Sequence, residues 1–261
     1  MDAAQPDFRL RTEKTVTLPF QVGTPASTEG INLDPLKFHP KPEVDYSGVN
    51  VPFHLSKEML SHFPKAKSPE SMVLDIGCGN SIHREVCERA GFEYAGLDYM
   101  EVGAHMLGDA HALPFKDNSF DFLLSIAVLE HIQNPFLMMH EAYRVLKPGG
   151  KFIGTVAFLE PHHQDSYYHH THLGTCNSLQ YAGFEIEQIA PSVGWSVLRA
   201  QAPILFSKLP APLPNLMVLP LHAAHRLWWK AGSLVSKKAT EETRLLWLTG
   251  SFTFIVYRPS G

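Results

Sequence analysis

The sequence is poor in cysteine and has no run of basic residues. Three cysteines (Cys78, Cys87 and Cys176) occur in 261 residues, and none of them forms a Cys-x-x-Cys pair. This scarcity argues against a disulfide framework or a structural zinc ribbon and fits a reducing compartment, with buried thiols as the simplest interpretation. The net charge of −4 offers no electrostatic footprint for a phosphate backbone, so we expect neither DNA nor RNA as a partner.

Long apolar runs are also absent. The most apolar region near the C-terminus, residues 203–229, is interrupted by five prolines. Because a spanning helix needs about 20 mostly apolar residues with internally paired backbone groups, we expect no transmembrane segment. The first 20 residues lack the charged and then apolar pattern of a secretory signal, and we therefore expect a cytoplasmic location.

The pattern along the chain predicts one α/β domain behind an extension. Residues 1–50 are rich in proline and polar residues and are interpreted as an N-terminal extension, so the domain would cover residues 51–261. From Met72, short runs that are apolar on both faces alternate with helical segments, as a parallel sheet covered on both sides requires. This pattern predicts a doubly wound fold, with strands at 72–77, 94–99, 120–127, 151–158 and 251–259 and helices at 82–90 and 135–146.

A glycine turn follows the first expected strand, in "VLDIGCGN" (residues 73–80). Gly77 and Gly79 allow the backbone to approach a ligand, and the next helix directs free N–H groups at it. A dinucleotide fingerprint would place a third glycine at position 82, where this chain has Ile82, so hydride chemistry is disfavoured. Asp98 ends the second strand, where a carboxylate can accept hydrogen bonds from ribose hydroxyls.

Residues 72–158 carry further motifs in a fixed order: "YAGLDY", "GDAHALPFKDNSFD", "SIAVLEHI" and "LKPGGKF". This run resembles the class I S-adenosylmethionine-dependent methyltransferases, in particular the small-molecule subgroup with an LDIGCG motif. The resemblance implies a Rossmann-like fold with a mostly parallel seven-stranded sheet and an antiparallel C-terminal strand, and S-adenosylmethionine as cofactor. One departure is Asn80, where the subgroup usually has glycine. The residues that the resemblance assigns to cofactor binding are Asp75, Gly77 and Gly79 for methionine and ribose, Asp98 for ribose, Asp109 and Ala110 for adenine, and Ser125 at the end of the fourth strand.

The stretch "EPHHQDSYYHHTHLG", residues 160–174, holds five of the fifteen histidines. It begins two residues after the strand expected at 151–158, so it leaves the sheet on the side where ligands bind. As a metal site for a divalent transition metal, it would use His162, His163, Asp165 and His169. As a metal-free pocket, it would provide a base or hydrogen-bond donor from among His131, His162, His163, His169 and His170, with Tyr167, Tyr168 and His172 toward the substrate. As a polar surface loop, it would do nothing chemical.

Residues 193–250 exceed what the sheet needs and are predicted to form a helical cap or lid. In "LHAAHRLWWKAGSLVSKK", Leu221, Ala224, Trp228, Ala231 and Leu234 fall at helical spacing beside basic residues. Such a helix packs as a lid, covers a long apolar substrate, or lies on an anionic membrane surface. We expect a small-molecule substrate that is partly apolar.

The predicted function is methyl transfer from S-adenosylmethionine to oxygen or nitrogen of a small molecule. Two alternatives remain: metal-assisted cyclisation or elimination with the same cofactor, and a non-catalytic cofactor-binding scaffold of the same fold. Tyr46, Phe53 and His54 are candidates for residues that fold over the cofactor, and the oligomeric state is left open.

Overall fold

The computed structural model describes residues 26–163 and 165–261, so the segment inspected for a secretory signal and half of the expected extension lie outside the described residues. The chain forms a seven-stranded sheet in the order β3-β2-β1-β4-β5-β7-β6. The strands are β1 Met72–Ile76, β2 Glu93–Asp98, β3 Met106–Leu107, β4 Phe120–Ile126, β5 Leu146–Ala157, β6 Glu185–Pro191 and β7 Ser251–Tyr257.

The strand directions confirm the predicted fold class. β1 is parallel to β2 and β4, and β4 is parallel to β5. β7 runs antiparallel to both of its neighbours, β5 and β6. The central strands are buried on both faces, which explains why their sequences are apolar without alternation.

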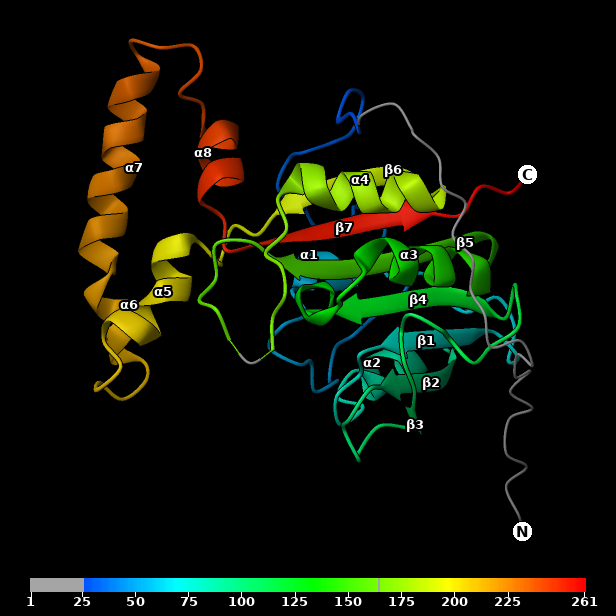
Figure 1. Cartoon of the computed structure of the whole chain (residues 1–261). Coiled ribbons are helices and arrows are strands. Elements are labelled where there is room, and N and C mark those ends of the chain that lie inside the picture. The colour runs from blue at the N-terminus through cyan, green and yellow to red at the C-terminus, as the bar shows by residue number, and fades with distance from the viewer. Residues whose placement is uncertain (1–25, 164) are drawn as a thin grey trace.

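Helices cover both faces of this sheet (Figure 1). α3 (Pro135–Val145) and α4 (His172–Ala182) pack over one face, whereas α1 (Lys57–Leu60) and α2 (Arg84–Arg89) belong to the core on the other. α4 begins inside the histidine stretch, because the Thr171 hydroxyl accepts the Gly174 N–H and caps the helix. It ends at Gly183, whose φ of 100° is the left-handed conformation that favours glycine.

The parallel strands end at one edge of the sheet, which we call the carboxyl edge. Because β6 is parallel to β5, the segment between β6 and β7 leaves and returns at this edge. It forms four helices among the described residues: α5 Val197–Leu205, α6 Leu213–Met217, α7 Leu219–Ser233 and α8 Glu241–Leu248. Figure 1 shows these helices beyond the end of the sheet, with α7 farthest from it. We call residues 193–248 the helical insertion.

The described part of the N-terminal segment crosses the domain. Asn32 forms a parallel bridge with Gln188 of β6, and the Arg89 Nε of α2 donates to the Asp45 carbonyl at 2.8 Å. Tyr46 packs edge-on against Phe63 in the core beside α2. Within the described residues, no helix has the length and apolar character needed to cross a membrane.

Candidate active site

The turn after β1 packs tightly against the loop that follows β4. Gly77 has a φ of +72°, and a Cβ atom added there would lie 2.3 Å from Val128 Cγ2. The Gly77 and Cys78 N–H groups both donate to the Leu97 carbonyl, at 2.7 and 3.1 Å. Only glycine satisfies this conformation and this contact together. The turn therefore lies directly against Val128, which precedes Glu130 by two residues.

Asp98, at the end of β2, is bound to the same turn. Its Oδ2 accepts the Gly79 N–H at 3.0 Å, and its Oδ1 accepts the Met100 and Glu101 N–H groups at 3.1 Å each. A carboxylate offers about four acceptor positions, so this one retains capacity for a ligand hydroxyl. A Cβ atom at Gly79 would meet nothing within 4 Å, so the turn faces open space there, as a cradle for a ligand requires.

Asp75 is fully buried in β1. Its Oδ2 accepts the Tyr94 hydroxyl at 2.7 Å and faces His83 Nδ1 at 2.9 Å. Within residues 26–163 and 165–261, its Oδ1 has no hydrogen-bond partner. Burial and the Asp75 charge raise the pKa of Tyr94 well above its ordinary value, so the phenol stays a donor. A buried carboxylate oxygen without a partner fits a site that receives a polar ligand group.

Three other predicted cofactor residues lie farther along the carboxyl edge. Asp109 is exposed, and its Oδ1 accepts the His111 N–H and faces His111 Nδ1 at 2.7 Å. His111 Nε2 accepts the Asn134 N–H at 3.0 Å, which places the ring proton on Nδ1. Ala110 is buried beside Asp109, and Ser125 is buried in β4 opposite Gly154.

Two apolar side chains beside Asp98 were not predicted from the sequence. Tyr99 and Met100 are 71% and 70% exposed. An exposed apolar pair next to a carboxylate with free acceptor positions is a suitable surface for a flat aromatic ring. Their position immediately after Asp98 was the signal that could have identified them.

Glu130, His131 and His163 converge next to the glycine turn. One ligand atom from each lies within 4.8 Å of the others. Glu130 and His131 belong to the short helix η1 (Leu129–His131), and His163 comes from the loop after β5. We call these three residues the Glu130 cluster. The structure thus brings together two of the predicted histidines with a glutamate that the sequence interpretation did not select.

Glu130 is fully buried, and neither carboxylate oxygen has a hydrogen-bond partner within the described part of the chain. Burial, with a smaller contribution from the Glu160 charge, raises the pKa of Glu130 to about 7. Its neighbours Val128, Leu129 and Ile132 are apolar, and a lone acid among them was the signal that could have identified it.

The two histidines of the Glu130 cluster have nitrogen atoms suited to accept protons or bind a ligand. Their ring centroids lie 5.2 Å apart. His163 Nδ1 is 3.1 Å from the Pro161 carbonyl, which can only accept, so the proton is on Nδ1 and Nε2 carries a lone pair. Burial and the neighbouring His163 lower the pKa of His131, which favours its neutral form near pH 7.

The loop of residues 158–171 is fastened on both sides. The Glu130 carbonyl accepts the Tyr167 and Tyr168 N–H groups, at 2.6 and 3.2 Å. On the other side, Trp195 Nε1 of the helical insertion donates to Glu160 Oε1 at 2.8 Å. The histidine stretch therefore connects the Glu130 cluster to the helical insertion.

The remaining predicted residues of this stretch have varied surroundings. His162 and Asp165 are exposed. His170 is buried. Its backbone N–H donates to the Ala157 carbonyl, and its ring Nε2 lies 3.3 Å from the Leu129 carbonyl, which ties the loop to η1. Tyr167 and Tyr168 are both partly exposed and hydrogen-bonded to Gln133. The buried Nε2 of His169 has no partner among the described residues, and the ring of His172 lies against Phe252.

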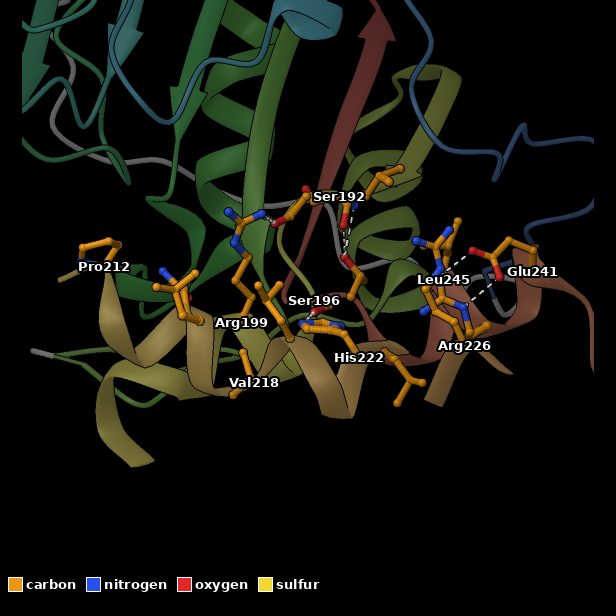
Figure 2. Close-up of a pocket in the computed structure, with 17 residues that line it drawn as sticks. Ser192, Ser196, Arg199, Pro212, Val218, His222, Arg226, Glu241 and Leu245 are labelled. Atoms are coloured by element: carbon orange, nitrogen blue, oxygen red, sulfur yellow. Dashed lines mark hydrogen bonds and ion pairs between the residues drawn. The ribbon is translucent and has the colours of Figure 1, made fainter. Parts of the chain in front are cut away.

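A cavity of about 460 Å³ lies between the helical insertion and the ends of β6 and β7. Figure 2 shows Arg199, Arg226 and His222 around it, together with Glu241. Glu241 forms its ion pair with Arg244, whereas neither Arg199 nor Arg226 has an ion-pair partner among the residues that the structure describes. The cavity combines apolar walls with an excess of positive charge. It includes no residue of β1, β2 or β4 and is separate from the glycine turn.

Comparison with known proteins places the central strands in one family. Residues 74–154 match the methyltransferase domain family. The biotin biosynthesis bifunctional protein BioHC of Teredinibacter turnerae is 36% identical over 98 residues, covering 37% of this chain and 16% of that protein. Demethylmenaquinone methyltransferase of Renibacterium salmoninarum is 35% identical over 96 residues, covering 33% of this chain and 40% of that protein. The chain spans less than half of the length of these curated relatives.

Among solved structures, the [4+2]-cyclase SpnF is similar with a TM-score of 0.50 and 19% identity. The similarity covers 76% of this chain and 77% of that one. At this level of identity, the likeness concerns the fold.

Proposed function

We propose that this chain, whose residues 74–154 match the methyltransferase domain family, is a class I S-adenosylmethionine-dependent methyltransferase that transfers a methyl group to oxygen or nitrogen of a small, partly apolar molecule. The observation that carries the proposal is the contact between Gly77 and Val128. This contact puts the Glu130 cluster beside the turn at which the cofactor would bind. A proton acceptor next to a methyl donor is what transfer to a hydroxyl or protonated amine requires.

The residues around the turn suit the cofactor. The Gly79 turn would hold its methionine part, Asp98 would accept its ribose hydroxyls, and the buried Asp75 Oδ1 offers a further acceptor. Tyr99 and Met100 would cover the adenine ring, with Asp109 and Ala110 beside it. When bound, S-adenosylmethionine supplies a sulfonium methyl whose carbon–sulfur bond breaks with the electron pair left on sulfur, as the substrate oxygen or nitrogen forms its bond to carbon.

The Glu130 cluster would take the proton that the substrate loses. With its pKa raised to about 7 by burial, Glu130 is matched to proton transfer near neutral pH, and His131, whose pKa is lowered by burial, is a further acceptor beside it. His163 is oriented by its hydrogen bond to the Pro161 carbonyl. Because Glu130 is buried and the two histidines are only partly exposed, proton transfer among them needs little solvent reorganisation.

We place the non-reacting part of the substrate in the cavity under the helical insertion. Trp195, whose neighbours Gly194 and Ser196 line the cavity, is hydrogen-bonded to Glu160. Glu160 is close enough for its charge to raise the pKa of Glu130. The cavity's apolar walls, and the guanidinium groups of Arg199 and Arg226, which form no ion pair within residues 26–163 and 165–261, favour a substrate with an apolar body and an acidic group.

A second candidate function for the Glu130 cluster is binding of a divalent transition metal. It is favoured by the hydrogen bond from His163 Nδ1 to Pro161, because metal-binding histidines commonly donate their other nitrogen to a carbonyl and so direct the free nitrogen at the metal. Two imidazoles and one carboxylate form a suitable donor set for zinc, iron or manganese. Of the metal set predicted from the sequence, only His163 belongs to the Glu130 cluster.

The test uses full-length protein purified without a histidine tag or chelator. It is incubated with S-[methyl-¹³C]adenosylmethionine and an organic extract of cells, and products are followed by mass spectrometry. We expect one labelled product for each S-adenosylhomocysteine released. Release of methylthioadenosine would instead indicate the non-methylating enzyme, and a bound cofactor that stays intact would indicate a scaffold. Failure to bind the cofactor would overturn the proposal.

Variants of neighbouring histidines distinguish the role of the Glu130 cluster. His163→Ala should lower turnover about a hundredfold, whereas His162→Ala, an exposed neighbour, is the matched control. Element analysis of the same samples decides about the metal. About one transition metal per wild-type chain that is lost in His163→Ala would establish the metal function, and metal-free active protein would exclude it.

A further inference from the structure

The helical insertion differs in charge from the rest of the protein. Residues 193–248 contain only two acidic residues, Glu241 and Glu242, but seven basic residues, in a chain whose net charge is −4. Among them, Lys230, Lys237 and Lys238 are exposed at the end of α7 and just beyond it. The insertion is therefore a basic body attached to an acidic domain, and its partner should be anionic.

The apolar stripe of α7 faces away from the protein. Leu221, Trp228 and Leu234 belong to the stripe predicted from the sequence, and they are 54%, 77% and 88% exposed. The side of α7 turned toward the protein carries His222 and Trp229 instead, which are hydrogen-bonded or packed against neighbouring helices. α7 has no buried residue in its whole length. The stripe is thus no part of a packed lid interior.

Exposed apolar side chains also occur on neighbouring parts of the insertion. Met217 of α6 is 55% exposed, and Val235, after α7, is 88% exposed. Scattered apolar side chains are common on soluble proteins, but a patch formed by successive elements marks an interaction surface. Figure 1 shows α7 as the outermost helix, unobstructed by the sheet domain.

We propose that the helical insertion binds the surface of an anionic lipid bilayer, with α7 lying in the interface. Leu221, Trp228 and Leu234 would enter the boundary between headgroups and acyl chains, and the lysines would bind lipid phosphates. Tryptophan suits this depth because its ring has an apolar body and one polar N–H. This inference is independent of methyl transfer and goes beyond it.

The charge of the insertion disfavours a second copy of the chain as its occupant. In a two-fold symmetric dimer, α7 would meet α7 and bring the net positive charge of both insertions together, with only Glu241 and Glu242 of each chain to offset it. A bilayer containing anionic lipid satisfies the apolar stripe and the lysines together.

The experiment is co-sedimentation of the full chain with vesicles of phosphatidylcholine containing about 30% phosphatidylserine, compared with pure phosphatidylcholine. We expect binding to the anionic vesicles that is at least about tenfold stronger, weakens in 0.5 M salt, and shifts tryptophan fluorescence to shorter wavelength. Trp228→Glu combined with Leu234→Glu should reduce binding about tenfold or more. The matched control is Phe38→Glu, which alters an exposed apolar residue (57% exposed) outside the insertion.

Both Trp228 and Leu234 are exposed, so their variants should fold, and circular dichroism checks this. Wild-type protein that stays in the supernatant with anionic vesicles at low salt would overturn the proposal. A wild-type dimer in light scattering that becomes a monomer in the Trp228→Glu, Leu234→Glu variant, without lipid binding, would assign the stripe to self-association and also overturn it. Lys237→Glu with Lys238→Glu should weaken binding to anionic vesicles and leave binding to neutral ones unchanged.

Discussion

The two halves of the carboxyl edge are built differently. The half at β1 and β2 is made mainly of backbone groups in the turns that follow two neighbouring strands, such as the Gly79 N–H that donates to Asp98. The half at β4, β5 and the helical insertion is made of side chains far apart in sequence, such as Glu130 and His163. The proposed cofactor would thus be bound by the backbone of two turns, whereas the proposed substrate side depends on how a loop and an insertion pack.

The largest effect should come from Gly77→Val. The new side chain would overlap Val128 and force a β-branched residue to a φ of +72°, so we expect cofactor affinity to fall by about a thousandfold or the protein to fail to fold. Gly48→Ala is the control, since Gly48 has a φ of +77° but nothing within 4 Å of its added Cβ. Calorimetric titration measures the cofactor affinity of each variant, and thermal unfolding measures its stability. Equal losses in the two variants would show that conformation alone, without the contact, explains the effect.

The second prediction concerns Glu130, the buried acid in the other half of the carboxyl edge. Folding raises the pKa of Glu130 from 4.5 to about 7, so the folded state holds its proton more tightly. The free energy of unfolding of the wild type should therefore fall as pH rises from about 4.5 to 7 and stay low above that. Glu130→Gln removes this cost and should stabilise the protein by about 2 to 3 kcal/mol at pH 8 and hardly at all at pH 5.

Urea unfolding at both pH values checks this prediction, with Glu58→Gln, a change at the surface, as the control. Glu130→Gln should also lose most of its turnover, because glutamine cannot accept the proton. An equal stability change at pH 5 and pH 8 would mean that Glu130 is not the titrating group.

A smaller effect is expected for Asp98→Asn. The amide keeps one oxygen for the backbone N–H groups but loses the charge that strengthens bonds to ribose hydroxyls, so cofactor affinity should drop about tenfold. Asp45→Asn is the matched control, because the Asp45 carboxylate also accepts a backbone N–H from its own loop. Unchanged affinity in the Asp98 variant would remove this residue from the cofactor site.

The smallest effect is expected for His162→Ala, which should change turnover by less than about twofold. His162 is exposed and lies next to His163. A large loss would show that the histidine stretch acts through residues outside the Glu130 cluster.

Local patterns of the sequence predicted the parallel strands and the glycine turn, because these follow from apolar runs and glycine positions. The antiparallel C-terminal strand was implied by the resemblance to the methyltransferases and is confirmed by β7. The strand order was not predicted, because it depends on pairing between segments far apart in the chain. Glu130 escaped notice because its burial depends on a loop that begins about thirty residues later. The periodicity of α7 was also evident, but periodicity alone does not tell which side of a helix faces the protein, and here the apolar stripe faces outward.

Calorimetric titration of S-adenosylmethionine into wild type, Gly77→Val and His163→Ala tests the central division most directly. We predict one site per wild-type chain, no detectable binding in folded Gly77→Val, and nearly unchanged affinity in His163→Ala. Loss of cofactor binding in both variants, or retention in both, would contradict the assignment of cofactor and substrate chemistry to separate halves of the edge.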